Sequence, residues 1–380
     1  FLEDRYNDYL GQAYFARAFA YYQMARRYGG VPILLEVSND ADLPRSSEED
    51  TWNQVLADFD CAAGLLAKTS YSRGQVNKYA ALAFKAEAML YAGSIAKYNE
   101  DFSDRLSYLG EKAAGVRIMG FDQANAASLS IKYFSEAYKA AREVMKDGGY
   151  SLRQASSNDP EALYRNMVDM WRDLSSPENI LVREYTYPTY THGLDAYSSP
   201  YLWHHPLAGG TCPTLDFMEL FDGFERYADG TIKVTDGANC GDGHYLQFDD
   251  PMDFFANAEP RLRAYVIFPG DEFRGETVET RMGIYTGPET EIEPFFDDYS
   301  YTSSGQTYQA LPQYTGTPKT LYMSSTPTSI ETVNVNGEIM NANGSCGPFY
   351  SYNEATLTGL HLRKYLDPDL TLEEIGEGMS

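Results

Sequence analysis

The stretch from Leu10 to Leu35 constrains the fold of this chain more than any other. Apolar residues recur there at steps of three and four, with an aromatic stripe beside them, so a helix would be apolar around more than half its circumference. Gly29 and Gly30 supply the positive φ that ends a helix, and Pro32 prevents its resumption. The sequence therefore predicts a long, packed helix that stops at a glycine pair.

Three more helices are predicted within the first 150 residues. The second begins near Ser46 and Glu49, which have the spacing of a capping box, and runs to Leu66. The third begins at Asn77 and is rich in alanine, and the fourth covers Ala124–Lys146 before a second glycine pair. The side chains expected to face inward on the fourth helix are Phe134, Ala137, Tyr138, Ala141, Val144 and Met145.

The helices form units of similar large and small residues, at the scale on which tetratricopeptide-like solenoids are built. After residue 150 the composition changes, because 16 of the 18 prolines follow that point. We predict a mainly α protein with a tetratricopeptide-like helical lobe at 1–150 and a loop-rich ligand-binding lobe of short strands and helices at 151–380. In the second lobe, Asn179–Tyr185 is interpreted as a strand and Thr214–Phe221 as a short helix.

The charge of the chain argues against one class of partner. Aspartate and glutamate number 55 against 30 lysines and arginines, which gives a formal net charge of −25 at pH 7. Phosphate backbones and anionic lipid surfaces would be repelled, so we expect no nucleic acid partner. No apolar run reaches the length of a membrane-spanning helix.

Signals for catalytic or metal chemistry are absent from the sequence. There is no Gly-x-Ser-x-Gly, no Gly-x-x-x-x-Gly-Lys-Ser/Thr, no His-Glu-x-x-His and no Cys-x-x-Cys. The oxygen-rich loop at 236–244 lacks the fixed spacing of a calcium loop, which favours a plain turn cluster. Cys61 is expected in the core, whereas Cys212, Cys240 and Cys346 fall in loops where a disulfide remains open. We predict no catalytic residue, no cofactor and no metal.

Several short motifs occur in an order that identifies a family. The first helix runs into Tyr28-Gly-Gly-Val-Pro-Ile33, with Ala16 and Gly30 where that family has Leu and Asp. Glu259-Pro-Arg-Leu262 corresponds to its Asp-Pro-Arg-Leu. The other matching segments are Asn77–Ala83, Tyr133–Ala141, Pro213–Gly223 and Thr358–Tyr365, the last ending in Arg-Lys-Tyr. By these motifs the chain resembles the SusD/RagB family, the SusD-like nutrient-binding outer-membrane lipoproteins of Bacteroidetes.

This resemblance implies a role in nutrient uptake. It implies a protein without enzyme activity that binds glycans at the extracellular face of the outer membrane and delivers them to a TonB-dependent, SusC-like transporter barrel. Membrane attachment would come only through an N-terminal lipid, which is absent from this chain. A SusD-like chain would also continue past Ser380 into further helices, so we expect this chain to be a fragment.

The candidate ligand-binding residues come from the chemistry of the loops, because family binding residues vary too much to be transferred. Sugar rings stack on aromatic faces, while their hydroxyls need polar partners at the rim. Aromatic residues beside Ser, Thr, His and Pro are concentrated between Tyr185 and Pro206 and again after residue 299. The residues predicted to form the ligand surface are Trp203, Tyr201, Tyr197 and His204, followed by Tyr301 and Tyr314.

Two other functions remain open from the sequence. A secreted carbohydrate-active enzyme would show the same acidic surplus and aromatic loops, and would need two carboxylates about 5 to 10 Å apart in the cleft. A peptide-binding helical-repeat adaptor would place its ligand in a concave helical groove instead, leaving the loop aromatics unused.

Overall fold

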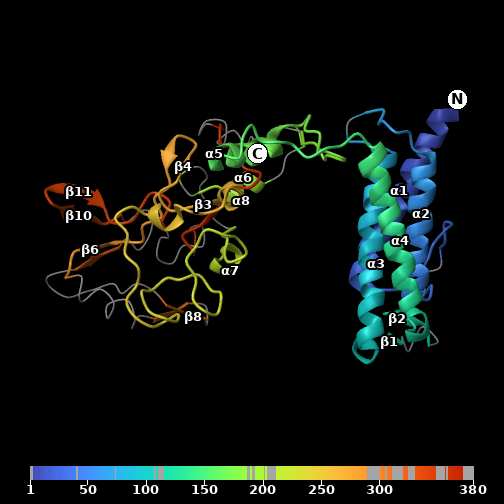
Figure 1. Cartoon of the computed structure of the whole chain (residues 1–380), viewed down its shortest axis with the longest axis horizontal. Coiled ribbons are helices and arrows are strands. Elements are labelled where there is room, and N and C mark those ends of the chain that lie inside the picture. The colour runs from blue at the N-terminus through green and yellow to red at the C-terminus, as the bar shows by residue number, and fades with distance from the viewer. Residues whose placement is uncertain are drawn as a thin grey trace. The chain divides into compact units, whose positions relative to one another are not determined.

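The computed structural model of the chain (Figure 1) describes residues 3–39, 42–72, 74–106, 108–109, 115–185, 189–190, 193–200, 202, 211–288, 300–303, 306–309, 320–323, 330–347, 356 and 358–370. For residues 100–106, 108–109, 196–197, 300–303 and 306–309 it describes the backbone alone. The chain divides into two compact units. The first is Phe1–Arg153 with Leu174–Glu184, and the second is Gln154–Asp173 with Tyr185–Ser380.

Four long helices lie side by side in the first unit, as Figure 1 shows. They are α1 (Glu3–Tyr28), α2 (Glu48–Leu65), α3 (Lys78–Leu106) and α4 (Gln123–Asp147). Helices that are consecutive in the chain pack on each other, and a short hairpin of β1 (Tyr108–Leu109) and β2 (Arg117–Met119) joins α3 to α4. The mainly helical, tetratricopeptide-like scaffold predicted from the sequence is confirmed.

The glycine pair ends α1 as the sequence predicted, but of the two glycines only Gly29 has the positive φ that was predicted for both. Gly29 has φ +70°, and a Cβ atom placed there would lie 2.2 Å from the Ile118 carbonyl oxygen. A Cβ atom on Gly30 would lie 2.1 Å from the Ser46 carbonyl oxygen, while the Gly30 amide donates to Ile118 at 2.7 Å. Only glycine fits at both positions, because the chain passes here between β2 and the start of α2.

The core of the helical unit is built around Trp52, which is fully buried beside Tyr22 and Tyr91. Its indole Nε1 donates to Glu48 Oε1 at 3.0 Å, and Glu48 Oε2 accepts from the Gly120 amide at 2.5 Å. Burial raises the pKa of Glu48 above its ordinary value, while these two hydrogen bonds oppose the rise. A buried carboxyl thus ties α2 to the chain segment that precedes α4.

Three expectations for the helical unit are corrected. Ser47, not Ser46, caps α2 by accepting from the Asp50 amide at 2.9 Å. On α4, Tyr138 is 64% exposed and Met145 is 81% exposed. The buried face of this helix contains residues 133, 137, 140 and 144. Tyr138 and Met145 each follow one of these residues directly in the chain, so their side chains point away from the buried face. Cys61 is exposed rather than buried, since it lies between the core positions Phe59 and Ala62 on α2.

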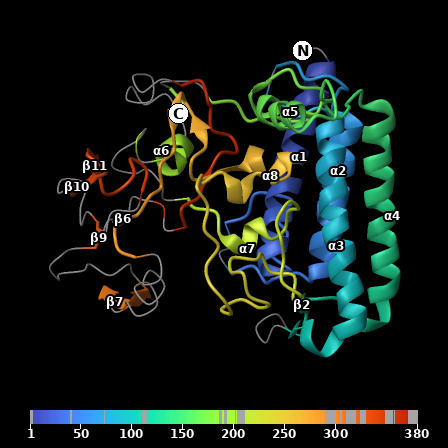
Figure 2. The same cartoon turned by 60° about the vertical axis from the view of Figure 1, so that its left-hand side comes forward.

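The second unit consists of short elements joined by loops. Its helices are α5 (Pro160–Arg172), α6 (Leu194–Ser198), α7 (Leu215–Met218), η3 (Asp253–Phe255) and α8 (Pro260–Tyr265). Its strands are β3 (Val266–Ile267), β4 (Glu272–Phe273), β5 (Glu276–Thr277), β6 (Ile284–Tyr285), β7 (Ser300–Ser303), β8 (Gln306–Gln309), β9 (Leu321–Tyr322), β10 (Thr332–Val335), β11 (Glu338–Asn341) and β12 (His361–Leu362). They form only antiparallel pairs, β3–β12, β4–β5, β6–β9, β7–β8 and β10–β11, and Figure 2 shows the pairs β6–β9 and β10–β11 near one another.

Two apolar clusters hold the described part of the second unit together. One contains Phe255 and Phe268, whose rings stack with centroids 4.3 Å apart, beside Leu262 at the start of α8. The other, which we call the Cys346 cluster, consists of Ile267, Phe273, Val278, Cys346 and Leu366. A loop-rich lobe is therefore stabilised by side-chain packing rather than by an extended sheet.

One predicted element of this region is shorter than expected and another is wrong. The helix predicted at Thr214–Phe221 is α7, which is capped by the Thr214 hydroxyl. The strand predicted at 179–185 is not formed, because this described segment has no partner strand. Its Ile180 instead packs against an apolar cluster of the helical unit, to which residues 174–184 belong.

None of the four cysteines forms a disulfide in the structure, and they differ in exposure, which predicts their reactivity. Cys61 and Cys240 are exposed, whereas Cys346 is fully buried and burial raises the pKa of its thiol to about 11. We expect Ellman's reagent to label Cys61 and Cys240 rapidly in the folded protein and Cys346 only after unfolding in urea. Peptide mass spectrometry identifies the labelled thiols, and rapid labelling of Cys346 in the folded protein would contradict the described packing.

Candidate functional site

Most of the predicted ligand residues lie outside the described part of the chain. Tyr201, Trp203, His204 and Tyr314 are all in this group. The backbone of the other two is described: Tyr197 belongs to α6, and Tyr301 belongs to β7, where it lies opposite Tyr308 of β8. The prediction that these six residues form one ligand surface therefore stays a prediction.

Two aromatic residues of the stretch from Tyr185 to Pro206 are described with their side chains, and they contact each other. The rings of Tyr185 and Tyr190 stack with centroids 5.5 Å apart and an interplanar angle of 12°. They are 41% and 49% exposed, respectively. An exposed pair of parallel rings offers a flat apolar surface with hydroxyl tips, which suits the C–H face of a sugar.

A second aromatic cluster in this unit was not singled out as a site by the sequence. The rings of Trp171, Tyr265 and Tyr365 gather around the Lys364 ammonium, which lies 5.7, 4.5 and 5.0 Å from their centroids. Tyr365 is 58% exposed. Trp171 is nearly 200 residues from Lys364 in the chain, so the sequence does not show that they are neighbours. The signal in the sequence for this cluster is the Arg-Lys-Tyr family motif.

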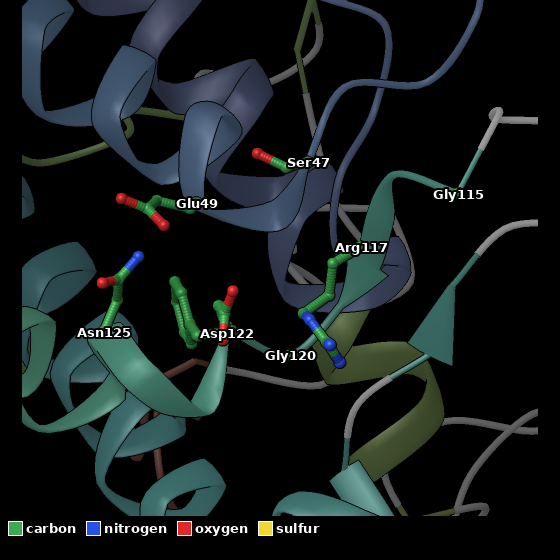
Figure 3. Close-up of a pocket in the computed structure, with 8 residues that line it drawn as sticks. Ser47, Glu49, Gly115, Arg117, Gly120, Asp122 and Asn125 are labelled. Carbon is green, nitrogen blue, oxygen red and sulfur yellow. The ribbon is translucent and has the colours of Figure 1, made fainter.

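A polar groove of about 400 Å³ lies at one end of the helical unit, where α2 and α4 begin (Figure 3). Ser47 and Asp122, the residues that cap these helices, lie on its wall. Figure 3 shows Glu49 of α2 and Asn125 of α4 facing each other, with Asp122 to one side of them and the Arg117 side chain pointing away. The groove offers hydrogen-bond partners, but its aromatic residue, Phe121, is only 1% exposed, so it lacks a stacking surface.

A second groove of about 330 Å³ runs between α2, α3 and α4. Lys85 lies in it, with only 7% of its side chain exposed, and pairs with Asp60 at 2.6 Å and Glu136 at 2.8 Å. Burial lowers the pKa of Lys85, but the two carboxylates raise it by more, so it stays above its ordinary value. These ion pairs join three helices. The charged side chains in this groove therefore pair with one another, and their presence does not require a ligand.

The loop at 236–244 is closed by its own hydrogen bonds. The Asp236 carboxylate accepts from the His244 amide at 2.8 Å, and Asn239 donates to the Asp242 carboxylate at 2.7 Å. Within the described residues, no three His, Cys, Asp or Glu side chains are placed to hold a metal ion. The helices of the described chain include none that is long and apolar enough to cross a membrane.

Comparison with known sequences places the first part of the chain. Residues 2–90 match the family SusD-like 3, which is described as "Starch-binding associating with outer membrane". SusD-like protein P38 of Formosa agariphila is 42% identical over 87 residues, which are 22% of this chain and 17% of that protein. The matched region therefore spans less than a fifth of the length of this relative.

Comparison with solved structures extends the likeness to the fold. A SusD-like protein from Bacteroides fragilis matches 98% of this chain with a TM-score of 0.55 and 20% identity, and the match covers 53% of that protein. A SusD-like carbohydrate-binding protein from the same species matches 97% of this chain with a TM-score of 0.52 and 14% identity, over 50% of its own length. The resemblance predicted from the motifs is therefore confirmed: this chain has the fold of the SusD/RagB family, and its residues 2–90 match a SusD-like family in sequence.

Proposed function

We propose that this protein binds oligosaccharides or polysaccharides at the extracellular face of the outer membrane, without chemical change. It then delivers them to a TonB-dependent, SusC-like transporter. The observation that carries the proposal is the match of residues 2–90 to a family described as starch-binding and associated with the outer membrane. In the proposal, an N-terminal lipid of the complete protein attaches it to the membrane, and the helical unit contacts the transporter.

The aromatic residues of the second unit support a glycan as the ligand. In the proposed site, Trp203, Tyr201 and Tyr197 stack on sugar rings and His204 binds hydroxyls, with Tyr301 and Tyr314 extending the surface. The exposed pair of Tyr185 and Tyr190 belongs to the same stretch of sequence and has the geometry that stacking needs. Capture by stacking and hydrogen bonding needs no general acid, nucleophile or metal, which agrees with the absence of such motifs from the sequence.

The test of this proposal is a calorimetric titration of a polysaccharide and oligosaccharide panel into the wild type and into Trp203→Ala. We expect at least one glycan to bind the wild type, and the variant to bind it about tenfold more weakly or worse, because buried tryptophans dominate binding energies. Product analysis of the same samples should find no released sugars.

A matched control removes an exposed aromatic ring from elsewhere. Tyr138→Ala deletes a ring that is 64% exposed on α4, and it should leave glycan binding unchanged. Released sugars would contradict the proposal and indicate an enzyme. A folded wild type that binds no glycan of the panel but binds peptides would also contradict it, and would favour a peptide-binding adaptor.

A further inference from the structure

The short helix α6 connects the described structure to the proposed glycan site. It carries Tyr197 in its last turn and ends three residues before Tyr201. A helix of only five residues has little stability of its own, so the position of Tyr197 depends on what holds α6 in place.

One buried arginine contacts α6 near both of its ends. The Arg274 side chain is 1% exposed, and its Nη2 donates to Asp195 Oδ1 at 2.7 Å in the first turn. Its Nη1 donates to the Ser199 hydroxyl at 3.1 Å, just after the last turn, and its Nε donates to the Asp367 carbonyl at 2.8 Å. The planar guanidinium thus connects α6 to a distant segment of the same unit.

The backbone position of Arg274 is unfavourable for an arginine. Arg274 and Gly275 form the two-residue turn between β4 and β5, with φ +49° and +77°. Such a turn normally has Asn, Asp or Gly at its first position, because other side chains are strained at positive φ. An arginine here is explained by its side chain rather than by the turn, since its guanidinium contacts α6.

Packing holds α6 a second time. Leu194, the first residue of α6, packs against the Cys346 cluster. Phe273 of that cluster directly precedes Arg274, whose guanidinium lies 4.7 Å from the Phe273 ring centroid. The contacts of Arg274 and the packing of Leu194 therefore fix α6 to one small part of the core.

We infer that Arg274 is a positioning residue for the glycan site, and that it holds α6 so that Tyr197 is placed before a glycan arrives. This inference rests on the proposed function. Because ordering mobile side chains on binding lowers affinity, a preorganised segment binds more tightly than a loose one. Arg274 itself is buried, so its effect on binding is expected to be indirect.

The test compares Arg274→Met with Arg363→Met. Arg363 is an equally buried arginine of the same unit, with 4% of its side chain exposed, but its described contacts are with Asp271, Val266 and the rings of Tyr164 and Phe273. Methionine keeps the apolar stem and removes the guanidinium in both variants. We expect Arg274→Met and Arg363→Met to lower the thermal stability equally. Arg274→Met should weaken glycan binding about tenfold or more, whereas Arg363→Met should leave the affinity within about twofold of the wild type.

Hydrogen–deuterium exchange provides a readout that needs no ligand. Amide exchange of the peptide that spans residues 193–200 should become faster in Arg274→Met and stay unchanged in Arg363→Met. If the wild type binds no glycan, the proposed function fails, while the exchange data still decide whether Arg274 orders this segment. Unchanged exchange in Arg274→Met, or equal loss of affinity in both variants, would overturn the inference. Should Arg274→Met not fold, Arg274→Gly removes the same guanidinium and relieves the turn, and Ser199→Ala removes one contact alone.

Discussion

Replacing Trp52 by alanine is expected to lower the free energy of unfolding of the helical unit by about 4 kcal/mol. The side chain is fully buried, and its removal leaves a cavity beside the rings of Tyr22 and Tyr91. It also removes the donor to Glu48, a carboxyl that is only 4% exposed and that, among the described residues, keeps the Gly120 amide as its hydrogen-bond partner. Urea unfolding followed by circular dichroism of the helices measures the loss.

Two matched variants separate the cavity from the lost hydrogen bond. The phenylalanine in Trp52→Phe fills most of the space but cannot donate a hydrogen bond to Glu48. We expect this variant to lose about 1 to 3 kcal/mol of the free energy of unfolding, because a buried polar group is left with one partner fewer. Tyr138→Ala, on the exposed side of α4, should change stability by less than about 0.5 kcal/mol. A Trp52→Ala protein as stable as the wild type would mean that the core of the unit is not centred on this residue.

The helices were predictable because their signal is repeated along the sequence. The apolar stripe of α2 and the glycine pairs after α1 and α4 each specify an element locally. The errors on α4 have a physical cause: its apolar arc is wider than the surface that α3 covers, so periodicity alone could not tell the buried Val144 from the exposed Met145. The predicted strand at 179–185 failed because a strand needs a partner, which is a long-range property.

The candidate site was less predictable than the fold. Aromatic residues in loops do not recur at a regular spacing. The sequence could therefore show that Tyr185 and Tyr190 belong to a stretch suited to binding sugars, but not that their rings stack. The contact of Arg274 with Asp195 joins residues 79 positions apart, and an arginine in a hairpin turn carries no signal of it. Positioning contacts of this kind are found only when the three-dimensional arrangement is known.

His361 is expected to make the second unit sensitive to acid. It lies in β12 opposite Ile267, is fully buried, and neither ring nitrogen has a hydrogen-bond partner of good geometry among the described residues. Burial lowers the pKa of His361 to about 4 from 6.5, and the backbone of Cys346 opposes the shift. The folded state therefore binds fewer protons than the unfolded state between these values, so stability is complete above pH 6.5 and falls as the pH drops towards 4. The free energy of unfolding is expected to fall by about 3 kcal/mol between pH 6.5 and pH 4.

The measurement is urea unfolding of the wild type and of His361→Gln from neutral pH to pH 4. Trp52→Phe is introduced into both proteins, so that the remaining tryptophans, Trp171 and Trp203, report on the second unit alone. Carboxylates that titrate in the same range contribute equally to both proteins, so the difference between the two pH profiles isolates the imidazole. His244→Gln, which removes an exposed histidine, should keep the wild-type profile. If His361→Gln also shows the wild-type dependence of stability on pH, the imidazole is protonated as readily in the folded state as in the unfolded state. His361 then cannot be the buried, neutral group of this core.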